Sequence, residues 1–285
     1  TRAVLRRHDL RPKRSWGQNF LVSRRAVATI AARCVDEPGR MVVEIGAGLG
    51  TLTRAILAAG GRVVAVERDR DLCRVLEAEL GGVPGFELAE ADAATFDYAG
   101  ILEQAPGVIA GNLPYQLTGR ILRRISDEGL PVPRAVLTVQ EEVAERLAAG
   151  PGDKARGALS VMIDARFEIA LVMRLLPSAF HPAPRVRSAV IELVRRQSPA
   201  FEGVDGVFFD RVVKAAFASR RKTIRNSLVA GGPMPAEVAE LALSQAAIDP
   251  GIRAEELPTS TFAGLAQALE HSSWQPPPTW SMFFP

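Results

Sequence analysis

The sequence predicts an α/β fold in which a mostly parallel sheet is followed by a small all-helical domain. Three observations support this prediction: short apolar runs alternate with helix-like stretches in the first half of the chain, the alternation stops after about Arg166, and only helical patterns follow residue 207. Strands that alternate with helices form parallel sheets covered on both faces. We therefore expect one domain over residues 1–200, a helical domain over 207–270, and a tail, 271–285, without a predicted role.

The individual elements follow from local signals, namely apolar runs for strands and helical periodicity ending at glycine or proline. Strands are predicted at 41–45, 63–66, 86–89, 108–110 and 135–139, and helices at 51–59, 69–80, 115–126 and 140–148. Two further strands, 167–175 and 188–194, have no long helix between them, so we expect antiparallel pairing at one sheet edge. The segment 197–206 contains proline and glycine and predicts a linker, after which helices are expected within 207–230 and 236–270.

Composition excludes several classes of protein. A hydrophobic fraction of 47% and a charged fraction of 24% fit a globular protein with a large core, and no apolar run approaches the roughly 18 residues of a membrane span. Cys34 and Cys73 lack metal-ligand spacing and the three histidines are scattered, so we expect buried reduced thiols, no metal site and a cytoplasmic protein. The chain begins with Thr1, so we expect residues to precede it, and the Arg-rich start lacks the apolar stretch of a secretory signal.

The net charge of +3 is unevenly distributed along the chain. Residues 2–25 hold Arg2, Arg6, Arg7, Arg11, Lys13, Arg14, Arg24 and Arg25 against the single acid Asp9, and a second cluster consists of Arg220, Arg221, Lys222 and Arg225. Basic clusters favour a polyanion partner, because each phosphate contact releases counterions. A solvated face that maintains solubility gives the same pattern, so charge alone leaves nucleic-acid binding open. The candidate RNA-binding residues are Arg11, Lys13, Arg14, Arg220, Arg221, Lys222 and Arg225.

A glycine loop, Glu44-Ile45-Gly46-Ala47-Gly48-Leu49-Gly50, follows the first predicted strand of the sheet and precedes a helix. Glycines at this place let the backbone turn tightly and approach a ligand closely. In a dinucleotide loop the third glycine comes one residue later, and Glu44 would face a diphosphate unfavourably. A cationic ligand suits Glu44 better, and S-adenosylmethionine (SAM) carries a sulfonium and an ammonium group.

Two more acids follow neighbouring strands. Glu67 ends the second strand, where its carboxylate could accept hydrogen bonds from both ribose hydroxyls, and Asp92 follows the third, where it could accept from the adenine amine of the cofactor. Each acid alone could be a surface charge, but three acids at successive strand ends converge on one crevice. We therefore expect the Rossmann-like sheet of a class I SAM-dependent methyltransferase.

The segment Gly111-Asn112-Leu113-Pro114-Tyr115 follows the fourth strand and suggests the chemistry. The exocyclic amine of adenine is a poor nucleophile because its lone pair is delocalised into the ring. The Asn112 side-chain oxygen and the Leu113 carbonyl could each accept one of its N–H bonds, and Pro114 restricts Leu113 to an extended conformation. Two acceptors placed in this way favour a pyramidal nitrogen aimed at the sulfonium methyl, so catalysis would consist of orientation and electrostatics.

Two aromatic residues are candidates for contact with the target base. Tyr115 could stack on the base, which contributes about 1–3 kcal/mol toward the few kcal/mol needed to unstack it. Phe180, in the proline-stiffened segment Phe180-His181-Pro182-Ala183-Pro184, could face the other side of the base. A simple proline turn with a core Phe remains the alternative for that segment.

These motifs resemble those of the small-subunit ribosomal RNA adenine dimethyltransferases, whose loss gives kasugamycin resistance in bacteria. The resemblance covers about Arg11 to Leu269. Beyond the motifs above it includes Gly17-Gln18-Asn19-Phe20-Leu21, residues 139–147, Ser188-Ala189-Val190 and residues 217–228. Departures from the family pattern are Trp16 where Phe is common, Ala47 where Pro is common, and Gln116-Leu117 where Asn-Ile is common.

The resemblance implies dimethylation of N6 on two adjacent adenines near the 3′ end of small-subunit rRNA by a SAM-dependent monomer that acts on a pre-assembled small subunit. The candidate catalytic residues are Asn112, Leu113, Pro114, Tyr115 and Phe180. The candidate cofactor-binding residues are Gln18, Asn19, Leu21, Glu44, Gly46, Gly48, Glu67, Arg68, Asp92, Ala93 and Asn112. On this interpretation residues 1–200 bind SAM and carry the catalytic site, and the helical domain lies against rRNA.

Three other functions fit part of the pattern. An erythromycin-resistance type methylase has the same core but acts on large-subunit rRNA; the segment 220–228 and the stretch Arg253-Ala254-Glu255-Glu256-Leu257 favour the small-subunit enzyme. An assembly factor whose binding matters more than its catalysis is not excluded by the sequence. A methyltransferase acting on small molecules would leave both basic clusters unexplained.

Overall fold

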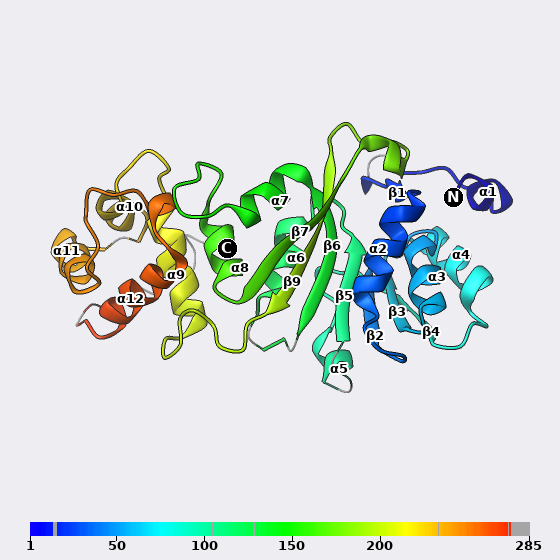
Figure 1. Cartoon of the computed structure of the whole chain (residues 1–285), viewed down its shortest axis with the longest axis horizontal. Helices are drawn as coiled ribbons and strands as arrows, with labels where there is room; N and C mark the ends of the chain where they lie inside the picture. Colours follow the sequence, from blue (N-terminus) through cyan, green and yellow to red (C-terminus); the bar gives the residue numbers. More distant parts are fainter. Residues whose placement is uncertain are drawn as a thin grey trace. The chain divides into compact units, whose positions relative to one another are not determined.

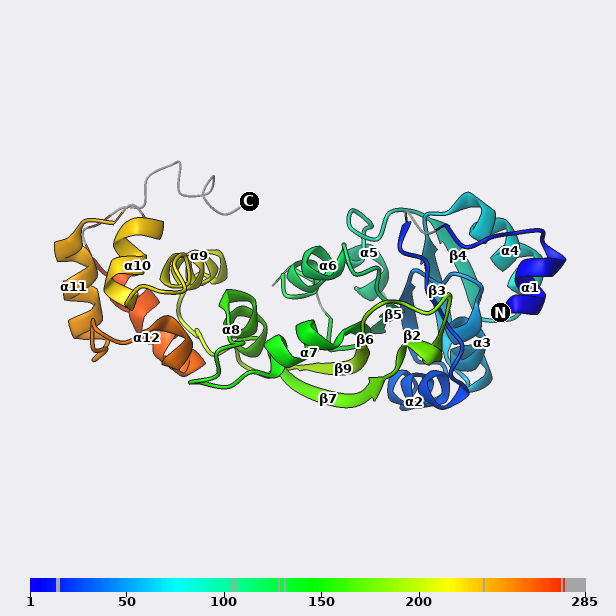
Figure 2. The same ribbon diagram turned by 90° about the horizontal axis from the view of Figure 1, so that it is seen from above.

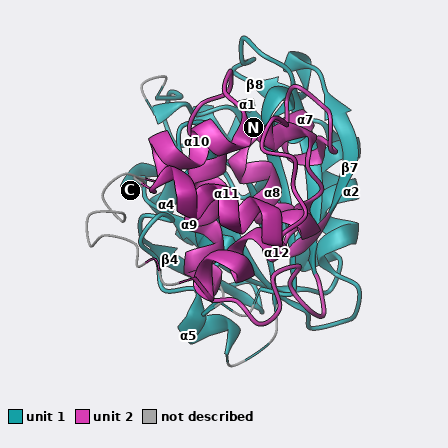
Figure 3. Cartoon of the chain, turned by 90° about the vertical axis from the view of Figure 1, so that its left-hand side faces the viewer, with its two compact units in different colours: residues 1–144, 169–195 teal, residues 145–168, 196–285 magenta. Residues whose placement is uncertain are grey.

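The computed structural model describes residues 1–13, 16–103, 105, 107–127, 129–130, 132–232, 234–272 and 274 (Figure 1). Arg14, which was predicted to bind RNA, and most of the tail lie outside the described residues. The chain divides into two compact units (Figure 3). We call Thr1–Ala144 with Ile169–Arg195 the sheet unit, and Glu145–Glu168 with Arg196–Pro285 the helical unit.

The sheet unit is built on a seven-stranded sheet in the order β4-β3-β2-β5-β6-β9-β7. The strands are β2 (Met41–Ile45), β3 (Arg62–Glu67), β4 (Phe86–Glu90), β5 (Gly107–Asn112), β6 (Arg134–Gln140), β7 (Phe167–Leu175) and β9 (Ser188–Arg195). Strands β2 to β6 pair in parallel, and β9 pairs antiparallel with β6. The predicted parallel sheet with an antiparallel edge is therefore confirmed.

Helices cover both faces of this sheet, with α2 (Arg24–Cys34) and α6 (Thr118–Ile125) on opposite sides (Figure 2). The other helices up to the end of the parallel part are α1 (Arg2–Arg7), α3 (Thr51–Ala58), α4 (Arg70–Leu80), α5 (Ala99–Leu102) and α7 (Glu141–Ala148). Ile30 of α2 and Ile56 of α3 are fully buried in one cluster with Val42 and Val108 of the sheet. Burial of apolar side chains on this scale stabilises the sheet unit by about 25 cal/mol per Å² removed from water.

Local signals fix where the helices begin. The Ser23 hydroxyl caps α2 by accepting from the Ala26 amide, and the Asp69 carboxylate caps α4 by accepting from the Asp71 amide. The predicted helix at 115–126 starts three residues later, at Thr118, because Pro114 to Leu117 form a turn in which the Leu117 amide donates to the Pro114 carbonyl at 2.8 Å. Helices α1 and α2 were not predicted from the sequence.

Two short strands join distant parts of the sheet unit. Strand β1 (Phe20–Leu21) pairs antiparallel with β8 (Phe180–His181), which follows a short 3₁₀ helix, η2 (Pro177–Ala179). The Val22 amide also donates to the Ala179 carbonyl at 2.7 Å. This pairing ties the N-terminal segment to the proline-rich segment before β9.

The helical unit contains α8 (Ala158–Asp164), α9 (Gly206–Ala216), α10 (Ile224–Gly231), α11 (Ala236–Gln245), the 3₁₀ helix η3 (Ala254–Glu256) and α12 (Thr259–Glu270). Its division from the sheet unit differs from the predicted boundary at residue 200, because residues 145–168 group with the C-terminal helices. The physical reason is that Val161 and Met162 of α8 share one apolar core with Phe209 and Leu265. None of the helices in the described part of the chain is long and apolar enough to cross a membrane.

Candidate active site

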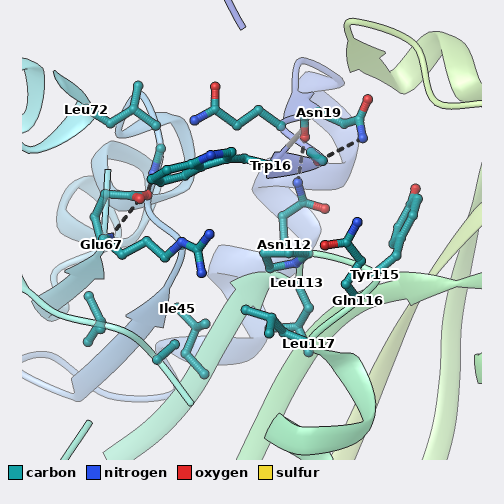
Figure 4. A pocket seen from close by; sticks show the side chains of 18 of the residues that line it. Trp16, Asn19, Ile45, Glu67, Leu72, Asn112, Leu113, Tyr115, Gln116 and Leu117 are labelled. Atoms are coloured by element: carbon teal, nitrogen blue, oxygen red, sulfur yellow. Dashed lines mark hydrogen bonds between the residues drawn. The ribbon is translucent and has the colours of Figure 1, made fainter. Parts of the chain in front are cut away.

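A pocket lies at the carboxyl ends of β2, β3 and β5, where ligands bind in open α/β sheets (Figure 4). The pocket contains about 930 Å³ of space free of protein atoms, part of it open to solvent. The lining residues are Trp16–Phe20, Ile45, Gly46, Gly48, Val66–Arg68, Leu72, Ala91, Ala93 and Asn112–Leu117. The pocket lies entirely within the sheet unit and contains most of the predicted cofactor-binding and catalytic residues.

The glycine loop shapes one wall of this pocket. Gly46 and Gly48 have φ values of +67° and +61°, a conformation that L side chains rarely adopt. A Cβ atom on Gly48 would also lie 3.2 Å from the ring of Phe20, which belongs to β1. The two glycines therefore allow the N-terminal segment to approach the loop closely and leave room for a ligand beside it.

Glu67 is held rigidly at the end of β3. Its Oε1 accepts from the amides of Arg68 and Asp69, both at 2.9 Å, and its Oε2 accepts from the amide of Gly48 at 3.0 Å. Burial raises the pKa of Glu67, and the three backbone donors oppose that shift. Oε1 accepts two of these bonds and Oε2 only one, so Oε2 keeps a lone pair for a further donor.

Glu44 does not line the pocket, contrary to the role suggested by its place before the glycine loop. The side chain is buried, and its Oε2 accepts from the Thr53 hydroxyl of α3 at 2.6 Å. Burial raises the pKa of Glu44 to about 8. Glu44 therefore connects β2 to α3 below the loop and presents no charge to a ligand in the pocket.

Asn112 is oriented by a contact with the N-terminal segment. Its Nδ2 donates to the Asn19 carbonyl at 2.7 Å (Figure 4). An amide has one donor side and one acceptor side, so Oδ1 is left as the acceptor, and no described residue donates to it. The backbone after Asn112 is fixed as well, because the Leu113 amide donates to the Thr138 carbonyl of β6 at 3.1 Å.

The two predicted aromatic contacts have different surroundings. Tyr115 lines the pocket, and its hydroxyl forms a hydrogen bond of 2.8 Å with the Ser188 hydroxyl at the start of β9. Phe180 does not line the pocket: it is 4% exposed, pairs with Leu21 in the β1–β8 ladder and packs in the core. Leu21, predicted to touch the cofactor, is buried in the same cluster. The apolar surface of both residues is thus engaged in packing.

Asp92 stands beside the pocket and does not line it. Its Oδ1 accepts from the Ala94 amide at 2.8 Å, and its Oδ2 lies 3.6 Å from Nη1 of Arg68. Its ion-pair partner Arg68 and the next residue in the chain, Ala93, do line the pocket. The expected acceptor for a cofactor amine is therefore already paired with an arginine.

Lys13 and Gln18 anchor the N-terminal segment on α4. The Lys13 ammonium lies 2.6 Å from Asp69 and 2.8 Å from Asp71, and these hydrogen bonds raise the pKa of Lys13. The Gln18 side chain donates to Asp69 at 2.7 Å. Lys13 was predicted to bind RNA, but its charge is matched by two carboxylates, whereas Arg11 is exposed.

Several lining residues were not predicted as site residues, namely Trp16, Gly17, Phe20, Ile45, Val66, Leu72, Ala91, Gln116 and Leu117. Ile45 and Val66 stand next to predicted site residues at strand ends, which is a signal that the sequence offered. Leu72 and Ala91 resemble core positions in sequence, because an apolar side chain gives the same pattern in a pocket wall as in a core. Trp16 is visible in sequence only as a departure from the family pattern.

The second basic cluster lies in the helical unit. Arg220, Arg221 and Lys222 are exposed in the turn between α9 and α10, and the Thr223 hydroxyl caps α10 by accepting from the Asn226 amide. Arg225 is different, because its Nε donates to Glu240 at 2.6 Å. Among these four residues, Arg225 has its charge matched by an acid.

Comparison with known proteins agrees with this geometry. The model of the family described as ribosomal RNA adenine dimethylase matches residues 10–271. The ribosomal RNA small subunit methyltransferase A of Myxococcus xanthus is 46% identical over 272 residues, which cover 94% of each chain. The protein of the same name from Anaeromyxobacter dehalogenans is 46% identical over 280 residues, covering 94% of this chain and 97% of the relative.

Solved structures share the fold. A crystal structure of the 23S rRNA methyltransferase ErmE is 28% identical, has a TM-score of 0.68, and covers 89% of this chain and 100% of its own. A dimethyladenosine transferase from Plasmodium falciparum has a TM-score of 0.71 at 22% identity, over 86% of this chain and 95% of its own. The chain therefore belongs to the ribosomal RNA adenine dimethylase family and is a SAM-dependent enzyme that methylates adenine in ribosomal RNA.

Proposed function

We propose that the enzyme dimethylates N6 of two adjacent adenosines near the 3′ end of small-subunit rRNA. The observation that carries this proposal is the orientation of Asn112, whose Nδ2 is committed to the Asn19 carbonyl. The Oδ1 atom is then an acceptor at the pocket, which suits an amine substrate with two N–H donors. A hydroxyl or thiol nucleophile has a single proton to donate and would not need this second acceptor beside the Leu113 carbonyl.

The residues of the pocket suit SAM as the methyl donor. Gly46 and Gly48 leave the loop backbone open to close approach, and Glu67 has a free lone pair on Oε2 for a ribose hydroxyl. Gln18 and Asn19 line the wall formed by the N-terminal segment. When bound, SAM would supply a methyl group carried on a positively charged sulfur. The sulfur would be left as a neutral thioether after the transfer.

The chain's own groups orient the amine. In the proposed mechanism Asn112 Oδ1 and the Leu113 carbonyl each accept one N–H bond of the adenine amine, which turns the nitrogen lone pair away from the ring. Tyr115 stacks on the base, at about 1–3 kcal/mol per stacked base. The product of transfer is a methylated ammonium, which is acidic and releases its proton to water, so the site needs acceptors in fixed positions rather than a strong base.

We further propose that the sheet unit carries catalysis while the helical unit binds rRNA through Arg220, Arg221 and Lys222, with Arg11 adding a contact from the N-terminal arm. Three exposed cations in one turn fit a phosphate backbone. The 46% identical relatives named for the small subunit support that substrate over the large subunit. In this proposal a monomer acts in the cytoplasm on a pre-assembled small subunit.

The test is transfer of label from SAM to small ribosomal subunits taken from a strain that lacks this methylation, with large subunits and naked RNA as controls. Labelled dimethyladenosine in the small-subunit RNA alone is the expected result. Label in large-subunit RNA would replace the proposal by the second candidate, which the similarity to the 23S rRNA methyltransferase ErmE favours. Binding of SAM and small subunits without label would point to an assembly factor.

A further inference from the structure

Residues 182–187 run beside the pocket between two anchored ends. His181, before the segment, pairs with Phe20, and Phe20 lines the pocket. Ser188, after the segment, forms a hydrogen bond of 2.8 Å with the hydroxyl of Tyr115, which also lines the pocket. Both ends of the segment therefore contact residues of the pocket wall, and the second end lies beside the side chain proposed to stack on the target base.

The backbone of this segment is restrained along its length. Pro182 and Pro184 fix their own φ angles. The Arg187 carbonyl accepts from the Glu141 amide at 3.1 Å, and strand β9 begins at the next residue. A segment that is ordered in advance loses less conformational entropy when a ligand binds to it, so residues 182–187 form a prepared contact surface.

Three successive side chains of the segment are exposed, namely Arg185, Val186 and Arg187. Val186 is 45% exposed, which places an apolar surface between two cations. None of the three residues lines the pocket, so the surface lies beside the cofactor and catalytic groups and does not belong to them. The combination of two guanidinium groups and one apolar side chain suits a ligand that is both anionic and partly apolar.

The two charges are not matched by acids. Within the described part of the chain, the side chains of Arg185 and Arg187 form no hydrogen bond or ion pair. The acid bonded to this segment through its backbone, Glu141, pairs instead with Arg174, whose Nε lies 2.8 Å from its Oε1. Arg225, by contrast, is paired with an acid. Two unmatched guanidinium groups within three residues attract an anion.

The position of the segment indicates which anion it binds. A nucleotide whose base enters the pocket stays joined to its neighbours through phosphates, and these remain outside. Arginine recognises phosphate through its planar fork of donors. We propose that residues 185–187 bind the RNA strand on one side of the target adenosine, with Arg185 and Arg187 on its phosphates and Val186 against the neighbouring nucleotide. This inference rests on the proposed function for which RNA is the substrate.

The first experiment locates the contact by crosslinking. The chain has two cysteines, and both are buried, so Val186→Cys adds an accessible thiol that can carry a short photoreactive maleimide. The labelled full chain is bound to small subunits that lack the methylation and is irradiated, and crosslinked nucleotides are mapped by primer extension. Crosslinks should fall within a few nucleotides of the adenosines that the unlabelled chain methylates.

Val83→Cys is the matched control, because Val83 is 37% exposed and lies between α4 and β4, at the end of the sheet opposite the pocket. It should give no crosslink near those adenosines. Crosslinks from Val186→Cys to a ribosomal protein would overturn the proposal in favour of a protein partner. Crosslinks that are absent or no different from those of the control would overturn it as well.

The second experiment measures methyl transfer to small subunits at several salt concentrations. Arg185→Gln and Arg187→Gln should each lower kcat/KM for the subunit about tenfold, the lower end for a hydrogen bond to a charged group. Each should also reduce the slope of log kcat/KM against log salt by about 1, and the double variant by about 2. Arg187→Lys keeps the charge and should restore most of the slope.

Arg62→Gln removes the same charge at the start of β3, where Arg62 is 54% exposed and 3.7 Å from Glu87, and its slope should equal that of the original chain. The dissociation constant of S-adenosylhomocysteine and the melting temperature should not change in Arg185→Gln or Arg187→Gln, because both residues are exposed and lie outside the pocket. Slopes equal to that of the original chain in both variants would contradict the proposal.

The outcomes separate this inference from the proposed function. If label from SAM enters large-subunit RNA instead, the crosslinking is repeated with large subunits. A crosslink from Val186→Cys beside the adenosine methylated there would mean that the proposed substrate fails and the contact surface stands. If small subunits are methylated normally but the crosslinks lie elsewhere and the salt slopes do not change, the contact surface fails and the function stands.

Discussion

Asn112 and Asn19 are joined by a hydrogen bond of 2.7 Å from the side-chain Nδ2 of the first to the backbone carbonyl of the second, across 93 residues of sequence. The bond decides which end of the Asn112 amide is available to a substrate. It also ties the N-terminal segment that carries Gln18 and Asn19 to the Asn-Leu-Pro-Tyr segment at the pocket.

Asn112→Ala should reduce single-turnover methyl transfer about 10² to 10³-fold at saturating SAM and RNA, by analogy with the removal of one preorganised polar group. Asn112→Asp should be as slow, because a carboxylate cannot donate to the Asn19 carbonyl and is no longer oriented. The rate is measured by quenched-flow with labelled SAM.

Asn19→Ala is the control for that prediction. The bond to Asn112 uses the Asn19 backbone, and the Asn19 side chain donates to the Gly17 carbonyl at 3.0 Å, so the variant keeps the orientation of Asn112. It should raise the KM for SAM and leave the single-turnover rate within about threefold. A rate in Asn112→Ala within threefold of the original would remove Asn112 from the mechanism.

The sheet and much of this pocket could be predicted because strand ends and glycine loops are local signals. The strands predicted at 41–45 and 167–175 have the observed bounds, and Glu67 and Asn112 line the pocket. The predictions that failed concern the direction in which a side chain points, which a local sequence pattern does not determine. Glu44 and Phe180 lie at predicted places in the chain, but their side chains turn into the protein, toward Thr53 and the core.

A tertiary contact also decides the role of Lys13. In sequence it is one of eight basic residues in 2–25, and nothing local distinguishes it from Arg11. The structure places it between Asp69 and Asp71, more than fifty residues away. A sequence shows which residues are charged, but not which of them form ion pairs in the folded chain. Arg225 is a second example, because its partner Glu240 is known only from the structure.

Ser188 positions the Tyr115 ring through the bond between their hydroxyls at 2.8 Å. Ser188→Ala should lower kcat/KM for RNA about two- to tenfold, which corresponds to the loss of a hydrogen bond of about 0.5–1.5 kcal/mol. Tyr115→Phe should have the same effect, and the double variant should be no worse than either single one. The measurement is steady-state methyl transfer with varied RNA at fixed SAM.

The double variant gives the decisive comparison for Ser188. Effects that multiply would show that the two hydroxyls act separately and that Ser188 does not position the ring. Because Ser188 is fully buried, the melting temperature of each variant is measured alongside. The dissociation constant of S-adenosylhomocysteine should stay unchanged in all three variants.

Arg221→Gln should weaken binding to small-subunit RNA and reduce the slope of log affinity against log salt by about 1, because one phosphate contact is lost. Arg225→Gln removes the same charge, but Arg225 is paired with Glu240 and should change the slope less. Affinities are measured by filter binding between 50 and 200 mM salt, roughly the range in which phosphate contacts dominate. Equal slopes for Arg221→Gln and the original chain would move the RNA surface elsewhere.

Glu44 should make the protein less stable as the pH rises. Burial raises its pKa in the folded chain to about 8, from 4.5 in the unfolded chain, so between these values folding takes up a proton. The free energy of unfolding then falls with rising pH by about 1.4 kcal/mol per pH unit, and the stability is fully present only below pH 4.5. Glu44→Gln remains neutral, and its carbonyl can still accept from the Thr53 hydroxyl.

The predicted difference is measured by urea unfolding at pH 6 and pH 8. Between these values the original chain should lose about 2 kcal/mol more than Glu44→Gln, because the substitution removes the proton uptake, which is itself half lost near pH 8. Glu77→Gln serves as the control, since Glu77 is exposed on α4 and should follow the original chain. Parallel pH dependence in Glu44→Gln and the original would mean that the carboxyl is ionised in the folded chain, and that the Thr53 hydroxyl stabilises a buried negative charge beneath the glycine loop.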